Sequence, residues 1–104
     1  MNEELLMHII SYSGTARSLC HEALTSFQEG AFETGEEKYQ QAKKELLNAK
    51  KKHGELLQHF ASAEAIETNL LMVHAEDHLT STNTIFELIS SFKYLFQAVK
   101  SQEN

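Results

Sequence analysis

The sequence predicts an all-α protein, an antiparallel up-down three-helix bundle, from three observations. The 104 residues contain no proline and only four glycines, so few residues interrupt a helix. Alanine, leucine, glutamate, lysine and glutamine are abundant, and these residues favour helices over strands. Apolar residues recur at intervals of three and four along most of the chain. A chain of this length suits one compact domain, which we expect to span residues 1–104.

The first helix is expected from about Glu3 to Glu29. Gly30 follows directly, where a residue in the left-handed conformation can satisfy the last carbonyl groups of the helix. The first turn is therefore predicted at Gly30. The apolar and small residues on one face of this helix are Leu5, Ile9, Tyr12, Ala16, Leu19, Ala23 and Phe27.

The second helix is expected to start near Ala31. Residues 34–37, TGEE, form a capping-box pattern, but a start there would leave Phe32 in a loop. Gly54 costs about 1 kcal/mol relative to alanine and weakens the helix beyond it. Residues 61–66 are the expected connection. The stripe of this helix consists of Phe32, Tyr39, Ala42, Leu46, Ala49, His53, Leu56 and Phe60.

The third helix is expected from about Glu67 to Lys100, roughly 50 Å long at 1.5 Å per residue. Two lines of residues run along it. One consists of Ile66, Leu70, Val73, Asp77, Thr80, Thr84, Leu88, Ser91 and Leu95. The other consists of Leu71, His74, His78, Ser81, Ile85, Phe92, Phe96 and Val99. Apolar residues on more than one face exceed what three helices can bury, which predicts an oligomer.

Charge and cysteine content exclude several classes of protein. The net charge of −6 and the pI near 5.4 leave no basic surface for nucleic acid. Cys20 is the single cysteine, so it cannot form an internal disulfide, and its position in the first helix assigns it to packing. Neither the basic-then-apolar pattern of a signal peptide nor an apolar run of about 18 residues appears in the sequence. We expect a soluble cytoplasmic protein without direct membrane insertion.

Asp77 and the two histidines lie on different faces of the third helix. Asp77 and His78 are about 100° apart, whereas His74 and His78 are one turn apart. An isolated aspartate is most often a solvated surface residue, and Thr80 and Thr84 on the same line favour that reading. In a cyclic oligomer whose axis follows the line, copies of Asp77 would meet instead, and a metal ion would neutralise them.

The residues alone leave three readings of the histidine pair open. In the first reading, His74 and His78 are partly buried residues that cap an apolar stripe. In the second, they bind zinc from one helix, because residues four apart can share a metal. A metallohydrolase, however, needs a glutamate where Ala75 or Asp77 stands. In the third reading one histidine is a nucleophile that carries a group covalently, and the other orients it.

Residues 73–79, VHAEDHL, closely resemble the V/M-H-x-Q-D-H-L segment of one family. It comprises the enzyme IIA components of the lactose/cellobiose (also chitobiose) class of the bacterial phosphoenolpyruvate-dependent sugar phosphotransferase system. Residues 13–18, SGTARS, are similar to its A-G-x-A-R-S motif, and residues 29–33, EGAFE, to its G-D/N-F element. The resemblance covers essentially the whole chain.

The resemblance implies a homotrimer of three-helix subunits, a nine-helix bundle. His74 would accept a phosphoryl group from the phosphocarrier HPr and pass it to the cognate IIB component, and through IIB to the membrane IIC component. His78 would lie beside the phosphoryl group and orient or bind it. Asp77 from three subunits would hold one divalent cation, Mg²⁺, at the trimer axis.

Two residues and the substrate remain open at this stage. The family usually has glutamine where Glu76 stands, and a carboxylate there would repel a phosphorylated His74 if it pointed toward the cleft. Arg17 either helps to hold the phosphoryl group or pairs with an acid on a neighbouring helix. The sugar is open among β-linked disaccharides. The alternative function is a helical interaction or regulatory module that has kept the fold without phosphoryl transfer.

Overall fold

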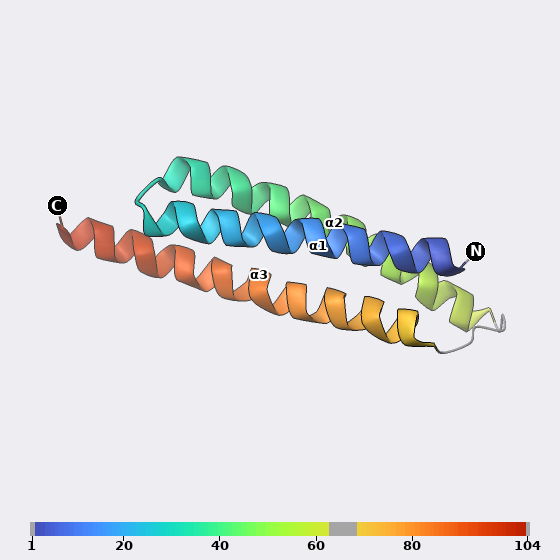
Figure 1. The fold of residues 1–104 in the computed structure, drawn as a ribbon. Helices are drawn as coiled ribbons and strands as arrows, with labels where there is room; N and C mark the ends of the chain where they lie inside the picture. Colours follow the sequence, from blue (N-terminus) through green and yellow to red (C-terminus); the bar gives the residue numbers. More distant parts are fainter. Residues whose placement is uncertain (1, 63–68, 104) are drawn as a thin grey trace.

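The computed structural model describes residues 2–62 and 69–103, which form three long helices (Figure 1). They are α1 (Asn2–Gln28), α2 (Phe32–Ala61) and α3 (Leu70–Glu103). The helices form a rod of 60 × 19 × 17 Å. α1 and α3 run in the same direction and α2 runs in the opposite one, as the colours in Figure 1 show. The predicted up-down three-helix bundle is confirmed.

The turn between α1 and α2 is closed by Gly30, as the sequence predicted. Gly30 has a φ of 81°, in the region that favours glycine. The N–H of Ala31 donates to the carbonyl of Ser26 at 2.8 Å, and the N–H of Gly30 donates to the carbonyl of Phe27 at 3.1 Å. These two bonds form a Schellman motif, which satisfies carbonyl groups at the end of α1.

The start of α2 confirms the expectation near Ala31. Ala31 occupies the N-cap position, without a side-chain cap, and the helix begins at Phe32 rather than at the TGEE pattern. Gly35 belongs to the packing, because a Cβ atom there would lie 2.5 Å from the ring of Phe27. Gly54 does not end the helix, which continues to Ala61 because the buried Leu56 secures its last turns.

The start of α3 is set by Asn69, a residue outside the predicted helix signals. The side-chain oxygen of Asn69 accepts a hydrogen bond from the N–H of Met72 at 2.9 Å, and this N-cap begins the helix at Leu70. The predicted start, Glu67, and residues 63–66 of the predicted connection lie outside the described residues. The other end of α3 reaches Glu103, beyond the predicted Lys100.

The core lies mainly around α1, which packs against both other helices. Because α1 has two neighbours, its buried face is wider than the predicted stripe and includes Leu6, Ser13 and Cys20. α3 packs mainly on α1 and contacts α2 less extensively. Its buried face is a third line, next to the predicted line through the histidines and roughly opposite the one through Asp77. We call this line the inward face; it consists of Met72, Ala75, Leu79, Thr82 and Ile89.

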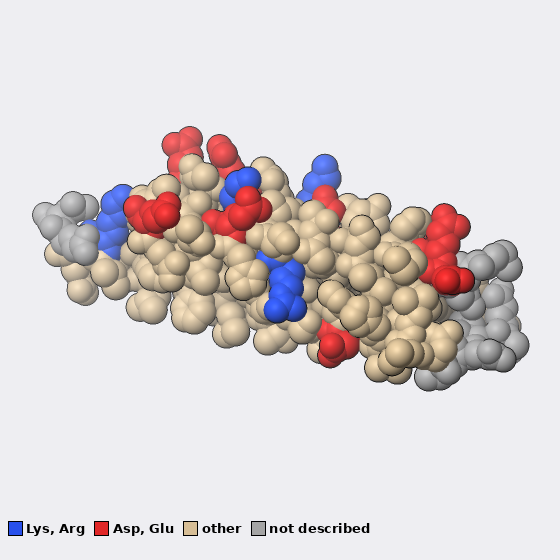
Figure 2. Space-filling model, viewed as in Figure 1, with Lys and Arg blue, Asp and Glu red and all other residues tan. Residues whose placement is uncertain are grey.

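Charged side chains are distributed unevenly over the rod. Figure 2 shows that they gather over the upper part of one face, along α1 and α2, whereas the lower part along α3 carries few. None of the helices in the described ranges is long and apolar enough to cross a membrane. On the face that Figure 2 shows, the charged side chains therefore lie mainly above α3.

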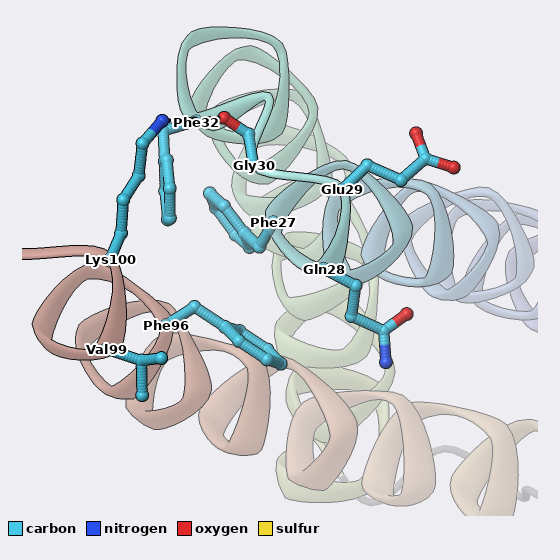
Figure 3. A pocket seen from close by; sticks show the side chains of 8 residues that line it. All are labelled: Phe27, Gln28, Glu29, Gly30, Phe32, Phe96, Val99 and Lys100. Carbon is cyan, nitrogen blue, oxygen red and sulfur yellow. Dashed lines mark hydrogen bonds between the residues drawn. The ribbon is translucent and has the colours of Figure 1, made fainter. Parts of the chain in front are cut away.

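The end of the bundle at the Gly30 turn is held together by side chains from all three helices. The Lys100 amine donates to the Gly30 carbonyl at 3.2 Å and lies 4.8 Å from the ring centre of Phe32. Figure 3 shows this reach across a pocket of about 370 Å³, into which Phe27, Phe32 and Phe96 project. α3 is thus fastened to the α1–α2 turn at its C-terminal end.

Candidate functional site

The two predicted histidines lie side by side near the start of α3. The ring centres of His74 and His78 are 4.5 Å apart, and the rings meet edge to face at 77°. His74 is exposed and His78 is half-buried. One ring is therefore open to a partner from solvent, and the second ring supports it from the next turn of the helix.

The surroundings of His78 favour one form of its ring. Its Nδ1 atom is buried and has no hydrogen-bond partner among the described residues. An N–H buried without an acceptor costs free energy, so the tautomer with the hydrogen on Nε2 fits better than the one with the hydrogen on Nδ1. In that form Nε2–H is a hydrogen-bond donor. The backbone carbonyl of His78 accepts a hydrogen bond from the Ser81 hydroxyl at 3.3 Å.

Asp77 lies on a different face of α3, which points away from the rest of the chain. Every described residue on this line is exposed, although several are large and apolar. We call it the outward face; it consists of Leu70, Val73, Asp77, Thr80, Thr84, Leu88, Ser91 and Leu95. Within residues 2–62 and 69–103 no three His, Cys, Asp or Glu residues come together to hold a metal. A cation at Asp77 would need ligands beyond those that residues 2–62 and 69–103 of one chain bring together.

Glu76, the residue that departs from the family pattern, is engaged with α2. Its carboxylate accepts a hydrogen bond from Nε2 of His53 at 2.6 Å. The side chains of His53 and Glu76 are 24% and 46% exposed. At 100° per residue, Glu76 and His74 lie about 160° apart around the helix. The Glu76 carboxylate therefore points away from His74. Within this chain it would not repel a phosphoryl group on His74.

Arg17 lies far from His74 along the rod. The hydroxyl of Thr82 donates to the carbonyl of Ser13 at 3.3 Å, which pairs residues of α1 with residues 69 positions later in α3. Arg17 is thus level with Phe86, about 18 Å along the axis from His74. It is exposed and forms no hydrogen bond or ion pair with the part of the chain that the structure describes. Neither expected role is supported within one chain.

Cys20 is a packing residue, as predicted. It is fully buried among Ala23, Ala42 and other core residues. Burial raises the pKa of its thiol to about 11, which leaves little reactive thiolate. A nucleophilic role for this cysteine is excluded by its surroundings.

His53 could not be predicted from the sequence as part of the site. Its position in the stripe of the second helix indicated burial but could not indicate a partner on another helix. A bond between residues 53 and 76 depends on the register of α2 against α3, which no local pattern encodes. Asn69 was different, because an asparagine before an apolar run is an N-cap signal.

Comparisons with known proteins agree with the motif around His74. Residues 4–97 match the family model described as "PTS system, Lactose/Cellobiose specific IIA subunit". The chain is 35% identical to the lichenan-specific phosphotransferase enzyme IIA component of Bacillus subtilis, over 98% of this chain and 96% of the relative. It is 31% identical to the N,N'-diacetylchitobiose-specific EIIA component of Escherichia coli K12, over 95% of this chain and 85% of the relative.

Solved structures show the same fold. The cellobiose-specific enzyme IIA from Bacillus anthracis superposes with a TM-score of 0.91 at 32% identity, covering 94% of this chain and 90% of that one. PtcA from S. mutans superposes with a TM-score of 0.86 at 39% identity, covering 89% of this chain and 91% of that one.

Proposed function

The chain belongs to the lactose/cellobiose-specific IIA family of the sugar phosphotransferase system, and we propose that it is a phosphocarrier whose acceptor is His74. The observation that carries this proposal is the exposed His74 ring with His78 directly behind it. A carrier of this kind needs an accessible nucleophile that two protein partners can reach in turn, rather than an enclosed substrate pocket.

The proposed step exchanges one phosphorus–nitrogen bond for another. The unprotonated ring nitrogen of His74 attacks the phosphorus of the phosphohistidine on HPr with its lone pair. As the new bond forms, the bond to the donor nitrogen breaks and its electron pair stays with the donor ring. Each ring keeps the hydrogen on its other nitrogen, so no proton has to move. In the second transfer, a nucleophile of the cognate IIB component attacks the same phosphorus, and the electron pair of the broken phosphorus–nitrogen bond stays with the His74 ring.

His78 has the position and the chemistry to assist this step. The tautomer favoured by its buried Nδ1 has a hydrogen on Nε2. A hydrogen-bond donor beside His74 would stabilise the negative charge on the phosphoryl oxygens. The side chain of a helical residue leans toward the N-terminus of its helix, so a group on His74 would lie over the first turn of α3. The positive end of the helix dipole adds to the stabilisation there.

We further propose that three chains associate through the outward face. Apolar residues such as Leu70, 84% exposed, and Leu95, 55% exposed, lie along it without cover in one chain. A three-fold axis along this face would bring three Asp77 carboxylates together, and one Mg²⁺ ion would neutralise them. Oxygen ligands suit Mg²⁺, whose role there is to hold the subunits together.

The partners and setting of the protein follow from this function. We infer that it acts in the cytoplasm, between HPr and a IIB component that serves a membrane IIC component. The named relatives differ in sugar, from lichenan to diacetylchitobiose. A β-linked disaccharide or a related oligosaccharide is the class that we propose.

The test is phosphorylation by phosphoenolpyruvate, enzyme I and HPr, read by intact mass. The wild type should gain one acid-labile phosphoryl group, His74→Ala should gain none, and His78→Ala should gain it slowly. Circular dichroism checks that each variant is folded. A folded wild type that stays unmodified would refute the carrier function.

The alternative function, an interaction module without transfer, loses its main support in this structure. That reading depended on Glu76 repelling a phosphoryl group, but the Glu76 carboxylate is bound to His53 on the opposite side of α3 from His74. The two functions separate on His74→Ala: a phosphocarrier loses all sugar-dependent phosphoryl flow while staying folded, whereas a module of this kind performs its whole function by binding and keeps its partner.

A further inference from the structure

Two polar side-chain bonds join α3 to α2 in the described part of the chain. Near the histidines, His53 donates to Glu76 at 2.6 Å. Near the other end, the amine of Lys93 donates to Glu36 at 3.0 Å. Figure 1 shows the C-terminal half of α2 passing behind α1 toward the first turns of α3, where the first of these bonds forms. The two bonds hold the two ends of α3 against the same helix.

Apolar packing alone leaves the rotation of the first turns of α3 weakly defined. Met72, Ala75 and Leu79 bury their side chains there, and Ala75 presents only a methyl group. Burial of apolar surface is not directional, and the neighbouring lines on α3 also contain apolar residues, such as Leu71 and Val73. A short hydrogen bond to a carboxylate, in contrast, fixes both distance and direction.

The position of Glu76 on the helix determines where the functional residues point. Glu76 lies about 160° from His74 and about 100° from Asp77 around the helix. With Glu76 held against α2, His74 must face away from α2 and Asp77 must face away from the core. One bond therefore sets the direction of both residues.

We propose that His53 is a positioning residue for phosphoryl transfer, acting through its hydrogen bond to Glu76 to orient His74. This inference rests on the proposed function of His74. His53 does not touch the reacting atoms. It acts because transfer between two protein-bound rings requires alignment of the attacking nitrogen with the phosphorus, and a displacement of about 1 Å can slow such a reaction about 100-fold.

The experiment measures transfer from phospho-HPr to the unphosphorylated protein. Rapid quench gives the rate over a range of phospho-HPr concentrations. The variants are His53→Ala, Glu76→Ala, the double variant and Glu76→Gln. Glu36→Ala is the matched control, because it breaks the other bond between α2 and α3. Hydrogen exchange of residues 70–79 gives a readout that does not depend on transfer.

We expect His53→Ala and Glu76→Ala each to lower the maximal rate about 10-fold, and the double variant to be no slower than either, because both remove one bond. The donor concentration at half-maximal rate should not change. Glu76→Gln should stay within about 2-fold of the wild type, since its amide oxygen still accepts the bond. Glu36→Ala should lower stability without slowing transfer.

Three results would overturn the proposal. One is a wild-type rate in His53→Ala. Another is a double variant whose loss of rate equals the product of the losses in His53→Ala and Glu76→Ala. The third is an equal slowing by Glu36→Ala, which would mean that general loosening of α3 is the cause. A wild type that accepts no phosphoryl group would instead refute the proposed function, and this inference would fall with it. That outcome is distinct because no variant would then have a rate to compare.

Discussion

The inward and outward faces of α3 both carry large apolar residues, yet only one of them is buried within the chain. Leu79 on the inward face is 8% exposed, whereas Leu88 on the outward face is 51% exposed. The inward face contains the small residues Ala75 and Thr82, which allow α1 to approach closely. The outward face also has small residues, such as Thr80 and Thr84, but it carries the charged Asp77 among its leucines. The difference teaches that a charge, rather than residue size, distinguishes the face available to other chains from the face that packs within one chain.

The largest expected effect comes from a charge on the outward face. Leu88→Glu would bring three carboxylates together at the proposed trimer axis and remove three leucines from it. At about 1.5 kcal/mol or more for each leucine, the trimer should lose at least about 4 kcal/mol. Sedimentation at micromolar concentration should then show folded single chains. Leu47→Glu on α2, 50% exposed in this chain, is the control; an intact Leu88→Glu trimer would contradict the assignment of this face.

A truncation on the inward face should destabilise each chain itself. Leu79→Ala leaves a cavity beside Met72 and Ala75 and should cost about 2–4 kcal/mol. For a chain of this size, the melting temperature should fall by about 10–20 °C. Thermal unfolding by circular dichroism, with Leu47→Ala as control, measures it. Equal melting temperatures for Leu79→Ala and the control would mean that the inward face is not the core contact of α3.

The cation predicted on the outward face can be tested separately. Without a cation, three Asp77 carboxylates at one axis would repel each other. EDTA should therefore lower the melting temperature of the wild type, and Mg²⁺ should restore about 2–3 kcal/mol at a hundred times its dissociation constant. Asp77→Asn should be insensitive to both. A wild type whose melting temperature ignores EDTA and Mg²⁺ would remove the cation from the proposed axis.

The smallest effect concerns Glu36 on α2, which accepts a hydrogen bond from Lys93 of α3. A hydrogen bond from Gln40 and one from Lys93 hold the pKa of Glu36 below its usual value of 4.5. Because the folded pKa is depressed, this stabilisation is present above about pH 4.5 and is lost as the pH falls through the folded pKa. Glu36 is partly exposed, so the effect should stay below about 1 kcal/mol.

Urea unfolding of wild type and Glu36→Gln between pH 3 and pH 6 tests this expectation. The wild type should gain stability over the variant as the pH rises through this range. Parallel curves for the two proteins would show that the contacts of Glu36 contribute nothing to folding.

The sequence predicted the helices well because each carries local signals. Gly30 ended the first helix, and three- and four-residue spacing identified all three. The spacing identified the line through Asp77, with a solvated face and an oligomer axis both open, but it did not identify the inward face of α3, since Ala75 and Thr82 look unremarkable beside Leu88 and Leu95. For the same reason His74 and His78 were found from a local motif, whereas His53 was not. Its contact with Glu76 joins residues 23 positions apart, and such contacts depend on helix register.

The buried Cys20 allows the opening of the helical bundle to be measured by thiol labelling. Its thiol is fully covered, and its pKa is raised to about 11. Thiol reagents can modify it only after the helices separate, because reaction needs both access and thiolate. Since it is the single cysteine of the chain, the rate of labelling counts opening events without interference from other thiols. That rate reports how often one chain exposes its core under native conditions, a quantity that melting temperatures do not give.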